Sequence, residues 1–190
     1  MPKSKAKIAR RAKEIKLLLM DADGVLTDGR IYLVPLSEGR VAEAKVFHSL
    51  DGAGLKLIRR AGIRTGVITG RRSEAMERRA RELKMDFVSQ GVEDKTKALG
   101  EILRTSGVTP KEVAYVGDDL GDLGPMKIVG LPMAVPNAVP EVRRAAAYVT
   151  RLAGGQGALR EVVELILRSQ GKWNRLAAAL SGQDSRGRLR

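Results

Sequence analysis

The sequence predicts an α/β fold, in which a doubly wound, mostly parallel (Rossmann-like) sheet is flanked by helices. Short apolar runs typical of buried parallel strands alternate along the 190 residues with longer amphipathic segments typical of helices. Several of these runs end in acidic, hydroxyl or basic residues, as expected at the carboxyl edge of an open sheet, where ligands bind. The length suits one domain with a sizeable core.

Strands and helices are expected in regular alternation. The apolar runs predict strands at residues 17–20, 65–69, 87–88, 113–116 and 133–135, with a last short strand at Val149. The amphipathic segments predict helices at residues 51–61, 73–84, 94–106, 120–129, 138–147 and 157–170. Gly62 and Gly107 stand where helices are expected to stop, and Asn137 with Pro140 fits a helix start. This repeated order favours parallel pairing.

The most informative segment is residues 21–27, Asp-Ala-Asp-Gly-Val-Leu-Thr, directly after the first apolar run. In an extended segment, residues i and i+2 face the same way, so Asp21 and Asp23 can address one site. Two like charges are costly to hold together unless a cation or a shared proton compensates them. The segment therefore indicates a metal site with an acid/base partner, and the alternative is an ordinary polar turn after a strand.

Three later segments place further chemical groups beside strand ends or helix starts. Thr69 ends the run at residues 65–69, and Lys95 lies at the start of the helix expected at 94–106. The run at residues 113–116 is followed by the acidic residues Asp118, Asp119 and Asp122. In a doubly wound sheet all of these groups would converge on one edge.

Taken in order, these motifs resemble the signatures of the haloacid dehalogenase superfamily of phosphatases. The likeness is closer to the phosphatases of 3-deoxy-D-manno-octulosonate 8-phosphate (KDO 8-phosphate) and spans residues 15 to 172. The segments that carry it are residues 21–29, 68–71, 114–120, 148–151 and 153–161. Many members of the superfamily carry a separate cap domain, but the segments between these motifs are too short to hold one. We therefore expect no cap domain.

The resemblance implies a catalytic role for both aspartates of the first motif. Asp21 would be the nucleophile that forms a phosphoaspartate, and Asp23 would protonate the leaving alkoxide and then activate water. Mg²⁺ would be held by Asp21, Asp118 and the backbone carbonyl of Asp23, because hard cations prefer oxygen ligands.

The resemblance also implies supporting roles around the phosphoryl group. Thr69 would donate a hydrogen bond to it, and Lys95 would offset its growing charge. Asp119 and Asp122 would act indirectly, by orienting Lys95, waters or the metal. For Asp122 a direct metal contact and a simple helix cap both stay open.

The substrate implied is a small sugar-acid phosphate. The residues expected to bind it are His48, Ser49, Leu50, Asp51, Gly52, Lys56, Gly70, Arg71, Arg79 and Arg160. Guanidinium groups can grip a carboxylate bidentately, whereas a lone histidine at a strand end is more often packed than catalytic. The family usually has arginine where this chain has Leu50, which leaves open an N-acylneuraminate 9-phosphate-type substrate. The glycine-rich loop at residues 152–157 could bind an anion or simply connect to the last helix.

A β-hairpin is expected just after the first motif. Residues 30–34 and 41–47 alternate in the manner of strands around a turn at residues 35–40. In the resembled family such hairpins assemble a tetramer whose subunits close one another's active sites, so a homotetramer is expected. A hairpin folded onto its own subunit is the alternative.

Positive charge is concentrated at the two ends of the chain. Residues 1–16 hold seven Lys or Arg against one Glu, and residues 172–190 hold five against one Asp, within a formal net charge of +13. We expect a basic tail at residues 1–14, the phosphatase domain at 15–171 and a second basic tail at 172–190. A basic nucleic-acid-binding module is the alternative from another functional class, but no base-reading motif is present, so no specific nucleic-acid partner is expected.

Other composition features narrow the function classes. There is no cysteine, which excludes disulfides and thiolate metal sites. No signal-peptide core or membrane-spanning run is found, so a cytoplasmic enzyme without membrane insertion is expected. The function expected is Mg²⁺-dependent hydrolysis of KDO 8-phosphate to KDO and phosphate, which the resemblance places in lipopolysaccharide biosynthesis.

Overall fold

The computed structural model describes residues 5–180 and has a six-stranded parallel sheet at its centre. The strand order is β5-β4-β1-β6-β7-β8. The strands are β1 (Leu17–Met20), β4 (Arg64–Thr69), β5 (Phe87–Gln90), β6 (Val113–Gly117), β7 (Leu131–Ala134) and β8 (Tyr148–Val149). β1 lies in the middle and is buried along its whole length, which explains why its sequence is a continuous apolar run.

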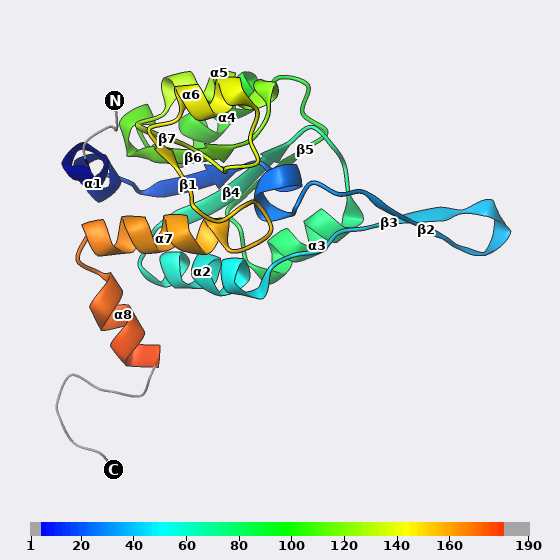
Figure 1. Ribbon diagram of the computed structural model, residues 1–190, viewed down its shortest axis with the longest axis horizontal. Helices are drawn as coiled ribbons and strands as arrows, with labels where there is room; N and C mark the ends of the chain where they lie inside the picture. Colours follow the sequence, from blue (N-terminus) through cyan, green and yellow to red (C-terminus); the bar gives the residue numbers. More distant parts are fainter. Residues whose placement is uncertain (1–4, 181–190) are drawn as a thin grey trace, which may run out of the picture.

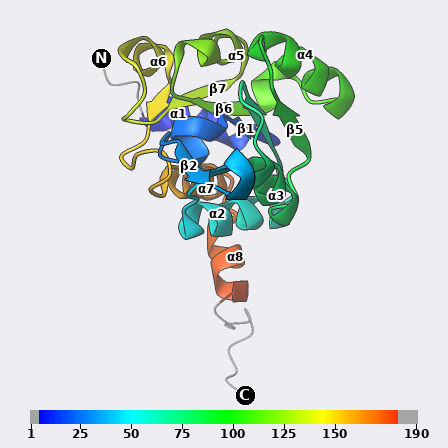
Figure 2. The ribbon, with the colours of Figure 1, turned by 90° about the vertical axis from the view of Figure 1, so that its right-hand side faces the viewer.

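Helices cover both faces of the sheet, as Figures 1 and 2 show. One layer contains α2 (Ser49–Arg60), α3 (Glu74–Glu82) and α7 (Ala158–Ser169). The opposite layer contains α4 (Lys95–Ser106), α5 (Leu123–Ile128) and α6 (Pro140–Ala145). The predicted doubly wound α/β architecture is confirmed, and no cap domain lies within residues 5–180.

The expected hairpin is present and projects from the body, at the right of Figure 1. β2 (Tyr32–Pro35) pairs antiparallel with β3 (Val41–Ala44) around a short 3₁₀ turn, Ser37–Gly39. All four residues of β2 are exposed. Because an isolated two-stranded sheet is marginally stable in water, this exposed arm is suited to contact with another surface.

Helix starts on the two faces are fixed by local side chains. The Ser73 hydroxyl accepts from the Met76 backbone N–H at 3.5 Å and begins α3. The Asp94 carboxylate accepts from the backbone N–H groups of Thr96 and Lys97 and begins α4. Gly107 ends α4 with a left-handed backbone, φ 69°. These boundaries place Lys95 in the first turn of α4, directly beside the sheet edge.

The segment predicted as one helix at residues 120–129 is divided in the structure. A 3₁₀ turn, Leu120–Asp122, precedes α5 because Asp119 and Asp122 form a reciprocal capping box around it. The break keeps Asp122 next to the end of β6 rather than one turn further along a helix.

Two further helices lie in the segments expected to be basic tails. α1 (Lys5–Lys13) buries Ile8 and Ala12, while α8 (Trp173–Leu180) follows α7. The Gln170 amide donates to the Ala12 and Ile15 carbonyls at 3.2 and 2.8 Å, tying α1 to the end of α7. The outermost parts of both tails, residues 1–4 and 181–190, lie outside the described residues. Among the described helices, none combines the length and apolar character needed to cross a membrane.

Candidate active site at the carboxyl edge of the sheet

Asp21 leaves the end of β1 and enters a tight turn, Ala22–Leu26. Its backbone N–H donates to the Val116 carbonyl at 3.0 Å, which holds the turn beside the end of β6. Gly24 has φ +86°, and a Cβ there would lie 2.1 Å from an Asp118 carboxylate oxygen. Only glycine fits this position, both for its backbone and for the closeness of Asp118.

Lys95 bridges two carboxylates at the centre of the site. Its Nζ lies 2.9 Å from Asp21 Oδ2 and 2.7 Å from Asp122 Oδ1. Burial raises the pKa of Asp21 to about 6, although the charge of Lys95 opposes the rise. Burial lowers the pKa of Lys95, but the attraction of Asp21 and Asp122 outweighs it, so the net shift is upward. Lys95 therefore remains a cation.

Asp122 is fully buried, and both of its oxygens are occupied. Oδ1 accepts from Lys95 and from the Tyr115 hydroxyl, each at 2.7 Å. Oδ2 accepts from the backbone N–H groups of Asp118 and Asp119 at 2.9 and 3.1 Å. This arrangement leaves no free oxygen for a metal. Asp122 orients Lys95 and at the same time caps the turn, so the two indirect roles considered from the sequence coexist.

Asp118 has the opposite character within the same acidic cluster. Its Oδ1 is buried without a hydrogen-bond partner. Burial, followed by repulsion from Asp21 and Asp122, raises its pKa to about 8. Oxygens of Asp21, Asp118 and Asp122 lie within 4.8 Å of one another, and because those of Asp122 are occupied, Asp21 and Asp118 are the two able to hold a metal ion. Asp119 is exposed and its Oδ1 accepts from the Leu120 backbone N–H at 2.8 Å.

Asp23 lies in a second, mixed-charge cluster that the sequence did not reveal. Its Oδ1 accepts from Lys45, the residue that follows β3, and Lys45 Nζ also lies 3.1 Å from Glu43 Oε1. Arg71 pairs with Glu43, and its Nε lies 3.7 Å from Asp23 Oδ2. The i, i+2 spacing of Glu43 and Lys45 was the available signal, because it places both on one face of the hairpin strand.

The glycine-rich loop packs directly against the turn that carries Asp21. A Cβ on Gly154 would lie 1.7 Å from the Gly24 carbonyl oxygen, and Gly155 N–H donates to the Val25 carbonyl at 3.0 Å. Asn137 joins the two segments, donating to the Gly24 carbonyl and accepting from Gly154 N–H, each at 2.9 Å. The loop therefore supports the turn that carries Asp21, and Asn137, expected only at a helix start, positions that turn.

Among the expected substrate residues, Asp51 and Arg79 are turned inward. Asp51 is 1% exposed and accepts from the backbone N–H groups of Gly157 and Arg160 at 3.2 and 2.8 Å, joining α2 to the start of α7. Burial raises its pKa. The Arg79 guanidinium lies over Gly52 and stacks on the Phe47 ring at 5.5 Å. Arg79 thus reaches the predicted segment, although Asp51 faces the protein interior.

The remaining expected substrate residues differ in how accessible they are. Leu50 is 52% exposed, and Lys56 Nζ lies 3.6 Å from Glu82. The Arg160 guanidinium pairs with Glu164 at 2.9 Å and stacks on Trp173 at 5.1 Å, so it is engaged by α7 and α8. The other members of the set are His48, whose buried Nδ1 has no hydrogen-bond partner, and Ser49 and Gly70, which are exposed. Thr69, expected to donate to the phosphoryl group, is buried at the end of β4.

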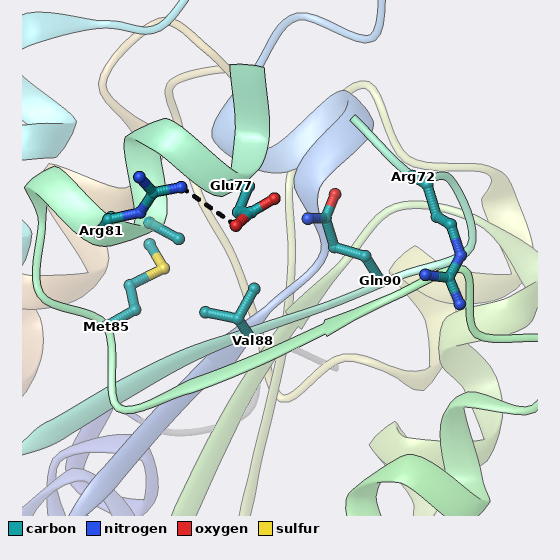
Figure 3. A pocket seen from close by; sticks show the side chains of 7 residues that line it. Arg72, Glu77, Arg81, Met85, Val88 and Gln90 are labelled. Atoms are coloured by element: carbon teal, nitrogen blue, oxygen red, sulfur yellow. Dashed lines mark hydrogen bonds and ion pairs between the residues drawn. The ribbon is translucent and has the colours of Figure 1, made fainter. Parts of the chain in front are cut away.

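A separate groove lies between α3 and β5 and is drawn in Figure 3. It encloses about 480 Å³, and an ion pair between Arg81 and Glu77 spans one side, with Met85 and Val88 beneath. None of the clustered aspartates lines it. The reactive groups therefore lie at the open sheet edge rather than in this groove.

Comparison with known proteins agrees with this geometry. A family model described as haloacid dehalogenase-like hydrolase matches residues 78–160. The 3-deoxy-D-manno-octulosonate 8-phosphate phosphatase of Yersinia pestis is 44% identical over 165 residues, which cover 87% of this chain and 86% of that protein. The chain belongs to the haloacid dehalogenase-like hydrolases.

Solved structures of this hydrolase family superpose on nearly the whole chain. The KDO 8-phosphate phosphatase of Moraxella catarrhalis, in complex with a magnesium ion, a phosphate ion and KDO, has a TM-score of 0.86 at 41% identity, covering 92% of this chain and 98% of that one. A cobalt-bound phosphatase from Haemophilus influenzae has a TM-score of 0.83 at 34% identity, covering 92% and 99%. The resemblance inferred from the sequence motifs is confirmed.

Proposed function

We propose that this hydrolase is a Mg²⁺-dependent phosphatase that converts KDO 8-phosphate to KDO and inorganic phosphate. The observation that carries the proposal is the meeting of Asp21, Lys95 and Asp118 at one point of the sheet edge. A carboxylate nucleophile, a cation and a further carboxylate are the groups that phosphoryl transfer to aspartate requires. The relatives named KDO 8-phosphate phosphatase support the choice of substrate.

The donor set fits a magnesium ion. Asp118 Oδ1 is a buried oxygen without a partner, and its carboxylate is crowded by two other acids, so a cation would relieve both costs. Asp21 and Asp118 would hold the metal, with the Asp23 backbone carbonyl as a further ligand. When bound, the ion supplies positive charge to the phosphoryl oxygens and favours the ionised form of Asp21.

The chain's own residues account for the chemical steps. A carboxylate oxygen of Asp21 attacks phosphorus, and the bond from phosphorus to the sugar oxygen breaks as Asp23 donates a proton to that oxygen. Asp23 then removes a proton from the water that hydrolyses the phosphoaspartate. Lys95, held by Asp122, would offset charge on the transferred group, and Thr69 at the end of β4 would donate a hydrogen bond to it.

We assign substrate choice to Arg71 and Leu50. Arg71 is 47% exposed at its side chain, which suits bidentate contact with the sugar carboxylate after exchange of its Glu43 partner. Leu50 supplies an exposed apolar side chain where the family usually has arginine. That difference favours an N-acylneuraminate 9-phosphate-type substrate as the second candidate.

The hairpin supports assembly as a homotetramer. The exposed apolar residues on and beside it are Ile31, Tyr32, Leu33, Val34, Leu36, Val41 and Val46. Clustering of this kind on a projecting arm is typical of a subunit contact. A neighbouring subunit would also cover the open sheet edge, where residues 5–180 provide no cap domain. We place the enzyme in the cytoplasm and in lipopolysaccharide sugar synthesis, as the resemblance of its motifs implies.

Phosphate release from KDO 8-phosphate, N-acetylneuraminate 9-phosphate and glucose 6-phosphate, each with Mg²⁺ and with EDTA, tests the proposal. We expect metal-dependent release with a kcat/KM preference of about a hundredfold for KDO 8-phosphate, which corresponds to about 2.7 kcal/mol. A preference for the nine-carbon substrate would transfer the assignment to the second candidate. A folded protein that releases phosphate from none of them would favour the basic nucleic-acid-binding module.

A further inference from the structure

Lys45 is a buried lysine for which the proposed reaction has so far no role. It follows β3 at the base of the hairpin, and its side chain is only 2% exposed. A buried ammonium is costly unless carboxylates compensate it, and here Asp23 and Glu43 do so. Through this contact the base of the hairpin, which lies outside the central sheet, reaches Asp23, the side chain expected to transfer protons.

The two oxygens of Asp23 are not equivalent. Oδ1 accepts from Lys45, while Oδ2 is buried and has no hydrogen-bond partner. Arg71 Nε lies 3.7 Å from Oδ2, which is beyond hydrogen-bond distance. Lys45 therefore supplies the hydrogen bond that orients this carboxylate, and without the lysine the side chain could turn away.

Glu43 fixes the lysine in turn. Lys45 Nζ lies 3.1 Å from Glu43 Oε1, and the other oxygen of Glu43 pairs with Arg71. The hydrogen bond from Arg71 lowers the pKa of Glu43, so this carboxylate is ionised and holds both cations. Asp23 and Glu43 thus form a closed group with the two cations, and rotation of the Asp23 side chain would break it.

We infer that Lys45 is a positioning residue, which holds the Asp23 carboxyl group in the orientation needed for proton exchange with the leaving sugar oxygen. The inference rests on the proposed phosphatase reaction and adds a residue outside the motifs to it. In that step the phosphorus–oxygen bond to the sugar breaks, and a proton on the Asp23 carboxyl group moves to the sugar oxygen. The lysine keeps its own protons and touches neither substrate nor metal.

A leaving-group comparison separates this role from simple anchoring of the hairpin. A sugar alkoxide needs a proton to leave, whereas p-nitrophenolate does not, so a misplaced acid slows phosphoryl transfer from the sugar phosphate alone. Hydrolysis of the phosphoaspartate is common to both substrates, so the comparison uses kcat/KM, which reports the transfer step. We expect Lys45→Met to lower kcat/KM on KDO 8-phosphate by about thirtyfold or more and kcat/KM on p-nitrophenyl phosphate by less than about threefold. Lys172→Met is the control, because that lysine donates to the Ala61 carbonyl at 3.1 Å, away from the site.

The double variant Lys45→Met/Asp23→Asn supplies the decisive arm. If Lys45 acts through Asp23, the double variant on KDO 8-phosphate will be no slower than Asp23→Asn alone. Equal losses of kcat/KM on both substrates, or additive losses in the double variant, would overturn the inference. Should Lys45→Met fail to fold by circular dichroism, Lys45→Arg retains a donor and is expected to keep the leaving-group profile of the parent. Wild-type turnover of both substrates tests the proposed function independently.

Discussion

Substitution of Asp118 by asparagine offers the sharpest test of the proposed metal site, because removal of this carboxylate is expected to stabilise the metal-free protein. Burial and two neighbouring carboxylates raise the Asp118 pKa from 3.8 to about 8. The unfolded chain ionises this group near pH 4, but the metal-free folded chain holds its proton up to about pH 8. The folded state therefore carries no penalty below pH 3.8, and the penalty grows as pH rises towards 8.

The size of that penalty follows from the pKa difference. Each unit corresponds to about 1.36 kcal/mol, so at pH 7 the cost in the metal-free protein reaches about 4 kcal/mol. Asparagine has no charge to suppress, and we expect Asp118→Asn to be about 2–4 kcal/mol more stable in EDTA at pH 7. For a chain of this size, that is a rise in Tm of roughly 5–15 °C.

Thermal unfolding by circular dichroism at pH 4.5 and pH 8, in EDTA and in saturating Mg²⁺, measures the effect. The gap between variant and wild type should be small at pH 4.5, large at pH 8, and reduced or reversed by Mg²⁺, which stabilises only the protein that binds it. The matched variant Asp122→Asn should instead lower Tm in EDTA, because its four hydrogen-bond donors lose a charged partner. An Asp118→Asn protein no more stable than wild type in EDTA at pH 8 would refute the reasoning.

Four further outcomes are expected. Asp21→Asn should lower kcat at least about a thousandfold with an unchanged circular dichroism spectrum, and normal turnover would reject Asp21 as the nucleophile. Lys95→Ala should chiefly lower kcat, by about a hundredfold or more, whereas Arg71→Ala should chiefly raise KM; steady-state kinetics showing the reverse would exchange their roles. Leu33→Lys, at a side chain 66% exposed on β2, should reduce the oligomeric mass seen by light scattering, and an unchanged mass would remove the hairpin from the assembly contact. The rise in Tm caused by Mg²⁺ should grow between pH 5 and pH 8, because burial raises the pKa of Asp21 to about 6 and the ionised carboxylate is the form that binds the metal.

The central strands could be predicted because they are buried and are followed by polar residues. β1 is entirely apolar and β6 is buried along its whole length, whereas the edge strands β5 and β8 are partly exposed. α1 could not be predicted, because only Ile8 and Ala12 of its nine residues are buried. A segment with so few apolar positions has the composition of a charged tail. The division at residues 120–129 also escaped prediction, because it depends on the capping of one turn by two aspartates.

The same distinction applies to the site, where contacts that follow from the sheet topology could be predicted and contacts between distant loops could not. Asp21, Lys95, Asp118 and Asp122 could be expected to meet, since each follows a parallel strand or opens a helix beside it, and the topology alone brings such positions together. The contact of Lys45 with Asp23 could not be predicted, because it forms only when the base of the hairpin packs against the turn that carries Asp23. Asn137 and Asp51 likewise act through backbone groups of distant segments, and no spacing in the sequence records such contacts.

Charge at the centre of the site connects stability with catalysis. Asp21, Asp118 and Asp122 face one lysine, which leaves an excess of negative charge when all are ionised. The chain satisfies Asp122 completely, but it leaves an oxygen of Asp118 without a partner. A fully compensated cluster would make a more stable protein, but it would have no place for a cation to meet a phosphoryl group. In the proposed reaction, the unpartnered oxygen of Asp118 would therefore tie metal binding to both folding and turnover.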